Sequence, residues 1–208
     1  MRYIKITDYI KNLTQEEIDW FDKNLIKGIK NQNRPDLERG LLLYSICKKI
    51  KAKRCLDIGT AGFFSARSMA KYGCEVDTID IKGEKDPNDG WDNINFIKGD
   101  STEVLDQLNK NSKTYDLVFI DGSHDYETVK RDIINAKIVS NLLVCHDYGN
   151  LPEVTRAIDE EILPDAVIIE DRMWYGAPYE NGYDKNGNKI DYGLVIYDPL
   201  KLLGEVII

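Results

Sequence analysis

The segment RCLDIGTAGFFS, residues 54–65, decides the fold. It opens with a short apolar run that closes on Asp57 and Gly59, and it continues into a helical pattern at 64–71. A strand that passes through a tight glycine turn into a helix is the repeating unit of parallel α/β sheets. The segment therefore predicts the first strand and first crossover helix of such a sheet.

The same unit recurs along the chain. Strand patterns at 75–81, 93–100, 115–122 and 141–147 are accompanied by helical patterns at 102–108, 126–138 and 154–162. Their continuous apolar runs are typical of strands buried on both faces of a parallel sheet. Two further strands, 165–171 and 192–198, are joined by a segment rich in glycine and proline in which no helix fits. We therefore predict a three-layer, Rossmann-like α/β fold with a mostly parallel sheet and an antiparallel last strand.

Two helices are expected before the sheet. Thr14 and Glu17 have the spacing of a capping box, which predicts a helix to about residue 30, and Pro35 suits the first turn of a second helix through about residue 50. Residues 1–52 are thus expected as N-terminal helices that pack on a core at 53–208. With 208 residues, the whole chain is expected to form a single domain.

Composition narrows the classes of partner. The chain carries 36 acidic and 28 basic side chains, a formal net charge of -8, which repels nucleic acid and anionic membranes. No window approaches the roughly 20 apolar residues of a membrane span. The four cysteines form no Cys-x-x-Cys pair, which indicates reduced thiols in a cytoplasmic protein. A small molecule is the expected partner.

The loop after the first strand predicts a nucleoside-containing cofactor. Ligands of open parallel sheets bind beyond the carboxyl ends of the strands, and glycines there let backbone approach a ligand closely. Asp80 ends the next strand 18 residues after Gly62, close to the ~20 expected for an acid that binds ribose. The loop offers only Gly59-x-x-Gly62, and Asp57 would repel a pyrophosphate, which argues against a dinucleotide. A turn that merely joins strand to helix stays open as the alternative.

Four segments together resemble the class I S-adenosylmethionine-dependent methyltransferases: DIGTAGFFS, TIDI, the GDS of FIKGDS, and FIDGSHDY followed by VCHDY. The resemblance spans about residues 54–147 and is nearest to the small-molecule O-methyltransferases of the macrolide-sugar (mycinamicin and tylosin type) and cephalosporin-hydroxylase-like group. It implies a seven-stranded sheet with a reversed last strand. The family usually has glycine where this chain has Phe63, so the loop glycine comes one place early, at Gly62.

The resemblance assigns cofactor contacts. S-adenosylmethionine would lie with its methionine end along Asp57 and Gly59, its ribose on Asp80 and its adenine beside Asp100 and Ser101. A helix N-cap is the alternative role for Asp100 and Ser101. The candidate cofactor-binding residues are Asp57, Gly59, Thr60, Gly62, Asp80, Asp100, Ser101 and Asp121.

Asp121 and Asp147 predict a divalent-metal site. They close two strands expected to be neighbours about 4.8 Å apart, so that their carboxylates can converge on one cation. The resemblance implies magnesium there, with the residue before the second acid as a frequent third ligand. Here that residue is His146, which suits manganese, iron or zinc better. We predict Mg or Mn at Asp121, His146 and Asp147; the alternative is that both acids only hold loops.

His124 is the candidate general base, with Asp121 as the second catalytic residue. The Asp-x-x-His spacing directs both side chains to one cavity, and imidazole titrates in the range needed to accept a hydroxyl proton. The resemblance implies the same role, whereas a structural hydrogen bond to Asp125 or Tyr126 is the alternative.

The expected activity is metal-assisted O-methylation of a hydroxylated small molecule, such as a sugar or glycosylated metabolite. Metal-independent methylation and a non-catalytic cofactor-binding module are the alternatives. The aromatic run Trp174, Tyr175, Tyr179 and Tyr183 would form an acceptor wall, a packed hairpin or a homo-oligomer contact.

Overall fold

The sheet has eight strands in the order β1-β7-β8-β6-β5-β2-β3-β4. The computed structural model describes residues 2–5, 10–25, 34–82, 90–149, 151–162, 166–170 and 193–204. The strands are β1 Arg2–Lys5, β2 Arg54–Ile58, β3 Glu75–Asp80, β4 Ile94–Lys98, β5 Leu117–Ile120, β6 Leu143–Tyr148, β7 Ala166–Glu170 and β8 Gly193–Tyr197. The helices are α2 Gln15–Asn24, α3 Arg34–Ile50, α4 Phe64–Tyr72, α5 Ser101–Lys110, α6 Tyr126–Val139 and α7 Pro152–Glu161.

The predicted fold class is confirmed. All the neighbouring pairs are parallel except those of β8, which runs antiparallel to both β6 and β7. A last strand of this direction needs no crossover helix, in agreement with the glycine-rich connection before it. One strand was not expected: β1 extends the sheet beyond the seven predicted strands by pairing parallel to β7.

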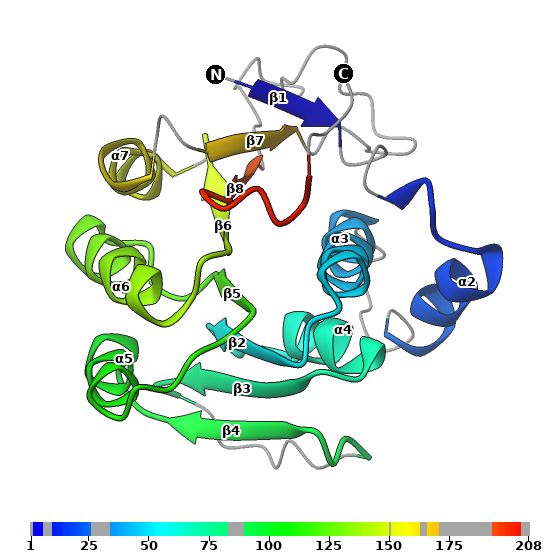
Figure 1. The fold of residues 1–208 in the computed structure, drawn as a ribbon, viewed down its shortest axis with the longest axis horizontal. Coiled ribbons are helices and arrows are strands. Elements are labelled where there is room, and N and C mark those ends of the chain that lie inside the picture. The colour runs from blue at the N-terminus through cyan, green and yellow to red at the C-terminus, as the bar shows by residue number, and fades with distance from the viewer. Residues whose placement is uncertain are drawn as a thin grey trace.

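Two cores form because successive strand residues face opposite sides of the sheet. Cys55 of β2 packs toward α3 and α4, in a cluster that includes Leu43 and Met69. Leu56, the next residue, packs toward α5, α6 and α7. Figure 1 shows the result, with α5, α6 and α7 on one side of the sheet and α2, α3 and α4 on the other. The carboxyl ends of the parallel strands stay accessible to a ligand.

The N-terminal helices are confirmed with one boundary corrected. The Thr14 hydroxyl accepts the backbone N–H of Glu17, and the Glu17 carboxylate accepts that of Thr14, which completes the predicted capping box. However, α2 ends at Asn24 rather than near residue 30, with Leu25 as its C-cap. Phe21 is fully buried beside Leu41 and Tyr44 of α3, so a hydrophobic cluster packs α2 against α3. The domain boundary at residue 52 stays a prediction.

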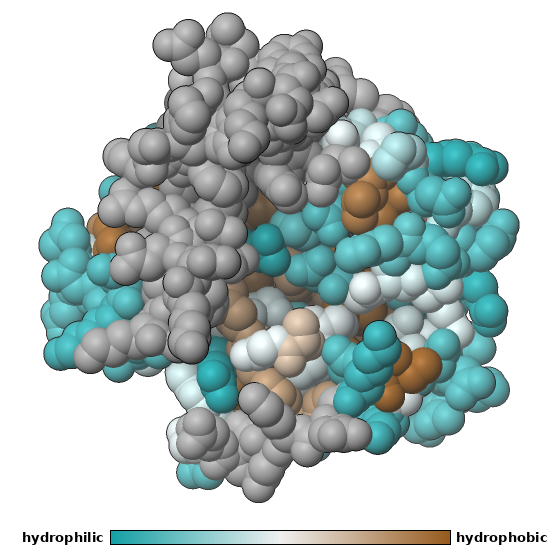
Figure 2. Space-filling model, turned by 180° about the vertical axis from the view of Figure 1, so that it is seen from behind, coloured by the Kyte–Doolittle hydropathy of each residue, from teal (hydrophilic) through white to brown (hydrophobic). Residues whose placement is uncertain are grey.

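The surface in Figure 2, seen from behind Figure 1, is mainly hydrophilic, with hydrophobic residues in small separate areas of its described part. Among the described residues, no helix combines the length and apolar character that a membrane span requires. The aromatic run at 174–183 lies outside the described residues, so its predicted roles are not addressed by the fold.

Candidate functional site

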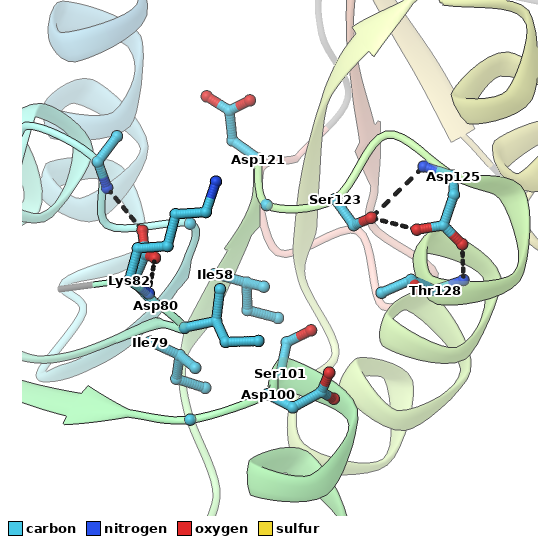
Figure 3. A pocket seen from close by; sticks show the side chains of 15 residues that line it. Ile58, Ile79, Asp80, Lys82, Asp100, Ser101, Asp121, Ser123, Asp125 and Thr128 are labelled. Atoms are coloured by element: carbon cyan, nitrogen blue, oxygen red, sulfur yellow. Dashed lines mark hydrogen bonds between the residues drawn. The ribbon is translucent and has the colours of Figure 1, made fainter.

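A cavity of about 480 Å³ opens at the carboxyl ends of β2, β3 and β5, where the sequence predicted a cofactor. Asp80 and Lys82 lie on one side of it and Ser123 on the other, with Ile58 and Ile79 between them (Figure 3). The volume falls within the range of small-molecule sites, and the lining combines aliphatic side chains with a few carboxylates. Of the predicted cofactor residues, the lining includes Gly59, Asp80, Asp100, Ser101 and Asp121.

Gly59 makes the contact that closes β2 against β5. Its φ is +100°, and an added Cβ would lie 2.1 Å from the backbone oxygen of Asp121. Its N–H donates to the carbonyl of Ile79 at 2.9 Å, so the same residue also ties the loop to β3. Only glycine fits this position, because any side chain would collide with backbone.

Phe63, where the resemblance predicts glycine, adopts a left-handed backbone conformation of the kind that glycine favours. Its φ is +62°, in the left-handed region, yet its side chain is only 6% exposed. The ring packs 6.0 Å from that of Phe96 on β4, centroid to centroid. The departure noted in the sequence is therefore accommodated: packing of the ring offsets the strain of the backbone.

Replacing Phe63 by glycine is expected to lower the free energy of unfolding by about 2 kcal/mol. The change relieves about 1–2 kcal/mol of left-handed strain but removes a buried phenyl group that contributes about 3–5 kcal/mol. Urea unfolding measures the difference. Ala61→Gly is the matched control, because Ala61 has φ +39° and an exposed side chain, so strain is relieved without loss of core. A more stable Phe63→Gly protein would contradict this balance.

Asp57 lies beneath the loop instead of lining the described cavity. Its Oδ2 accepts the Thr78 hydroxyl at 2.6 Å, and the Thr78 and Thr60 hydroxyls are 2.7 Å apart. Both Asp57 and Thr60 are buried, and burial raises the pKa of Asp57 to about 7. The cavity lining also omits Gly62, whose added Cβ would meet nothing within 4 Å. Direct cofactor contact by these three residues stays a prediction.

Asp80 uses both carboxylate oxygens to hold backbone. Oδ2 accepts the N–H of Ala61 at 3.1 Å, and Oδ1 accepts the N–H of Lys82 at 2.8 Å. The acid that ends β3 therefore shapes the loop after β2. Because a carboxylate has about four acceptor sites, two backbone bonds leave capacity for ligand hydroxyls.

Asp100 is the N-cap of α5, which was the alternative to a cofactor role. Its Oδ1 accepts the backbone N–H of Thr102 at 2.9 Å and that of Glu103 at 3.4 Å. Ser101 donates its hydroxyl to Asp132 of α6 at 2.9 Å. Asp132 is fully buried, and its Oδ1 has no hydrogen-bond partner in the described part of the chain. Burial raises the pKa of Asp132 to about 7.

This buried acid predicts a pH dependence of stability. Because the folded-state pKa of Asp132 lies above its ordinary 3.8, its contribution is fully present below about pH 4 and is lost as pH rises through about 7. Asp132→Asn should therefore reduce the stability difference between pH 5 and pH 8 by on the order of 2 kcal/mol. Urea unfolding at both pH values checks this. An unchanged difference would contradict a protonated Asp132.

A β-bulge brings His146 and Asp147 together at the end of β6. Cys145 pairs with Val195 and Tyr148 with Gly193, so the two residues between them face a single residue of β8. Asp147 has a φ of +61°. Bulges re-aim side chains and recur next to active sites. In a regular strand, the side chains of neighbouring residues point to opposite faces of the sheet. The bulge instead brings these two side chains together, with His146 Nδ1 only 3.1 Å from Asp147 Oδ1.

Asp121, just after β5, completes the group. Its Oδ1 lies 3.1 Å from His146 Nδ1, and its Oδ2 accepts from Arg39 at 3.1 Å. Burial alone would lower the pKa of His146, but hydrogen bonds to Asp121 and Asp147 raise it to about 8. A second, small cavity next to the first is lined by Asp121, His146 and Asp147 together with His124. The sequence-predicted reacting residues thus converge as expected.

His124 pairs with Asp147 rather than with Asp125 or Tyr126. Its Nε2 lies 3.2 Å from Asp147 Oδ2, and its side chain is 58% exposed. One potential metal-ligand atom from each of Asp121, His124 and Asp147 lies within 4.8 Å of the other two. His124 therefore has the position of either a base or a metal ligand, and Asp125 instead caps α6.

Sequence reasoning missed Arg39 and Asp132. Arg39 precedes Asp121 by 82 residues in the chain, and no local motif links a residue of α3 to the end of β5. Asp132 stands in a helical pattern where an acid usually faces water. Its one signal is its position on the inward face of α6, beside the buried Val129 and Ile133.

Comparison with known proteins indicates a methyltransferase domain in the central part of the chain. Residues 56–148 match the family model described as a methyltransferase domain. An O-methyltransferase from Bacillus cereus, solved in complex with SAH, has 15% identity and a TM-score of 0.55; the match covers 92% of this chain and 95% of that one. The O-methyltransferase TomG from Streptomyces achromogenes, solved with SAM, has 14% identity and a TM-score of 0.55, with coverages of 88% and 89%. No curated protein matches the chain.

The family match and the cavity fall on the same part of the chain. The matched residues, 56–148, run from β2 to β6 and include every loop that lines the cavity. The parts outside the match are β1, α2, α3, α7, β7 and β8, which extend the sheet and add helices to both of its faces.

Proposed function

We propose that this protein is an S-adenosylmethionine-dependent methyltransferase that transfers the cofactor's methyl group to a hydroxyl of a small molecule, with assistance from a divalent cation. The observation that carries the proposal is the convergence of two carboxylates and two imidazoles at the ends of β5 and β6. This group adjoins the cofactor cavity, because Asp121 lines both. A sugar or glycosylated metabolite is the acceptor class that the sequence resemblance favours.

The cavity fits S-adenosylmethionine. Gly59 presents bare backbone at the end of β2, and Asp80 keeps acceptor capacity for ribose hydroxyls at the end of β3. The solved relatives from Bacillus cereus and Streptomyces achromogenes carry SAH and SAM, respectively. We extend that ligand to this chain, with the methionine end toward Gly59 and the adenine toward Asp100 and Ser101.

The residues at the reacting end also fit a cation. Neighbouring ligands of an octahedral ion with 2.1 Å bonds are about 3 Å apart, and His146 Nδ1 lies 3.1 Å from one carboxylate oxygen of each aspartate. Asp121, His146 and Asp147 would hold the ion, and the imidazole favours manganese over magnesium. When bound, the ion supplies Lewis acidity that lowers the pKa of an acceptor hydroxyl.

His124 is placed to remove the acceptor proton. Its exposed imidazole at the cavity edge can reach a hydroxyl, whereas the buried His146 cannot. Asp147 Oδ2 orients the His124 ring from 3.2 Å and stabilises the imidazolium that forms. When bound, S-adenosylmethionine would supply the methyl group to the deprotonated hydroxyl, and the two adjoining cavities would bring cofactor and acceptor together.

Metal-independent methylation is the second candidate, and one observation favours it. Arg39 lies 3.1 Å from Asp121, and a protonated His146 lies 3.1 Å from both Asp121 and Asp147. These two cationic side chains can therefore balance the charge of the aspartates without a metal ion. In that case the ion pairs of Asp121 and Asp147 would only orient His124. A chelator separates the two, since methyl transfer would be insensitive to it without a metal.

Manganese titration tests the metal site directly. We expect one Mn²⁺ per chain, lost in Asp147→Asn, weakened in His146→Ala and retained in His124→Ala. Asp106→Asn, an acid that bonds Asn135 between α5 and α6, is the control. If Mn²⁺ does not bind the wild type, the metal-independent mechanism replaces the first. If His124→Ala loses the ion and His146→Ala keeps it, then His124 is the third ligand.

A further inference from the structure

Three buried cysteines meet at the end of the sheet opposite the cofactor cavity. Cys47 belongs to α3, Cys55 is the second residue of β2, and Cys74 directly precedes β3. All three are fully buried, and all three are free thiols. Their meeting point lies at the amino end of β2, whereas Gly59 and the cofactor cavity lie past its carboxyl end.

The three sulfur atoms are spaced as ligands of one ion. Cys47 Sγ lies 3.7 Å from Cys55 Sγ, and all three sulfurs are within 4.8 Å of one another. Metal–sulfur bonds of 2.3 Å place neighbouring sulfurs about 3.8 Å apart in a tetrahedral site and about 4.0 Å apart in a trigonal one. Only a small adjustment of side chains separates the observed cluster from either geometry.

The surroundings select the kind of ion. The cluster belongs to an apolar core with Leu43 and Met69, and the three candidate ligand atoms are all sulfurs. Soft thiolates instead favour Cu(I) and Zn(II). The carbonyl oxygen of Ala52 lies 3.5 Å from Cys74 Sγ and is the nearest described candidate for a fourth ligand.

The turn before Cys74 lies at the surface of the protein. Gly73, the preceding residue, is exposed, and an added Cβ there would meet nothing within 4 Å. Cys74 itself is buried but directly follows this open turn.

We propose that Cys47, Cys55 and Cys74 bind one thiophilic d¹⁰ ion, Cu(I) or Zn(II), at a site independent of methyl transfer. Binding replaces thiol protons, which pass to solvent, and no electron is transferred. The bound ion would add a side-chain link between α3, β2 and the start of β3, where β2 and β3 are already joined by their backbone pairing. The competing explanation is that the three thiols only fill space in the core.

Titration with Cu(I) under anaerobic reducing conditions, and separately with Zn(II), tests the site. The protein is the Asp147→Asn variant, so that the proposed manganese site does not contribute. We expect one ion per chain in at least one titration, at least a tenfold loss of affinity in Cys74→Ser, and thiolate-to-metal charge-transfer absorption when Co(II) is used as a probe. The ion should also protect the cysteines from alkylation.

Cys145→Ala is the matched control. Cys145 is equally buried but packs on the other face of the sheet, and burial raises its pKa to about 12. It should leave ion binding unchanged. If neither ion binds, or if Cys74→Ser and Cys145→Ala bind equally well, the thiols only pack and the proposal is overturned. Should Cys74→Ser fail to fold, ion protection of Cys47, Cys55 and Cys74 in the Asp147→Asn protein decides the question.

Discussion

Gly59→Ala is expected to lower the free energy of unfolding by roughly 2–5 kcal/mol and to abolish binding of S-adenosylhomocysteine. A left-handed φ of +100° costs an alanine about 1–2 kcal/mol, and the clash of its Cβ with the Asp121 carbonyl adds about 1–3 kcal/mol more. Relief of the clash requires β2 and β5 to separate, which distorts the cofactor cavity between them. Urea unfolding and calorimetry measure the two losses.

Gly73→Ala separates the two causes. Gly73 has a φ of +108°, yet an added Cβ there meets no atom within 4 Å. It should therefore show only the backbone cost of about 1–2 kcal/mol and keep full cofactor binding. Equal losses in the two variants would contradict the close approach of β2 and β5.

His124→Ala is expected to slow methyl transfer by roughly 10²–10⁴-fold, the usual contribution of a general base. Cofactor affinity should change little, because His124 does not line the larger cavity. The assay follows transfer of a labelled methyl group from S-adenosylmethionine to a panel of hydroxylated small molecules. Asp106→Asn is the control, since Asp106 lines neither cavity and bonds Asn135 between α5 and α6.

The pH profile distinguishes a base from a structural residue. Loss of a base should remove the acidic limb of the rate profile, and His124→Gln, which keeps a hydrogen bond to Asp147 but cannot titrate, should be as slow as His124→Ala. If His124→Gln retains the wild-type rate, His124 only positions Asp147.

Seven strands of the sheet could be predicted because each leaves a local signal. Strands buried on both faces are apolar runs in the sequence, and glycine or an acid marks the carboxyl ends at Gly59 and Asp80. The edge strand β1 leaves no such signal: its four residues, RYIK, begin and end with a charged residue, and they pair with β7, far along the chain. The early end of α2 also escaped prediction, because helix ends depend on caps and packing more than on periodicity.

The site could be predicted as far as strand ends determine it. Asp80, Asp121 and Asp147 lie where the topology requires. The bulge that turns His146 and Asp147 to the same side depends on pairing with β8, and the approach of Arg39 depends on how α3 packs. The depth of Asp57 follows from its bond to Thr78 on the neighbouring strand. These features depend on contacts between residues that are far apart in the sequence, so local residue patterns do not predict them.

Calorimetric titration of S-adenosylhomocysteine into the wild type and Asp80→Ala tests the central claim, cofactor binding at the ends of β2 and β3, most directly. The wild type should bind one molecule per chain. Asp80→Ala should bind at least tenfold more weakly, because it removes the ribose acceptor and frees the N–H groups of Ala61 and Lys82. Wild-type protein that ignores S-adenosylhomocysteine but binds NADH or a nucleotide sugar would contradict the account.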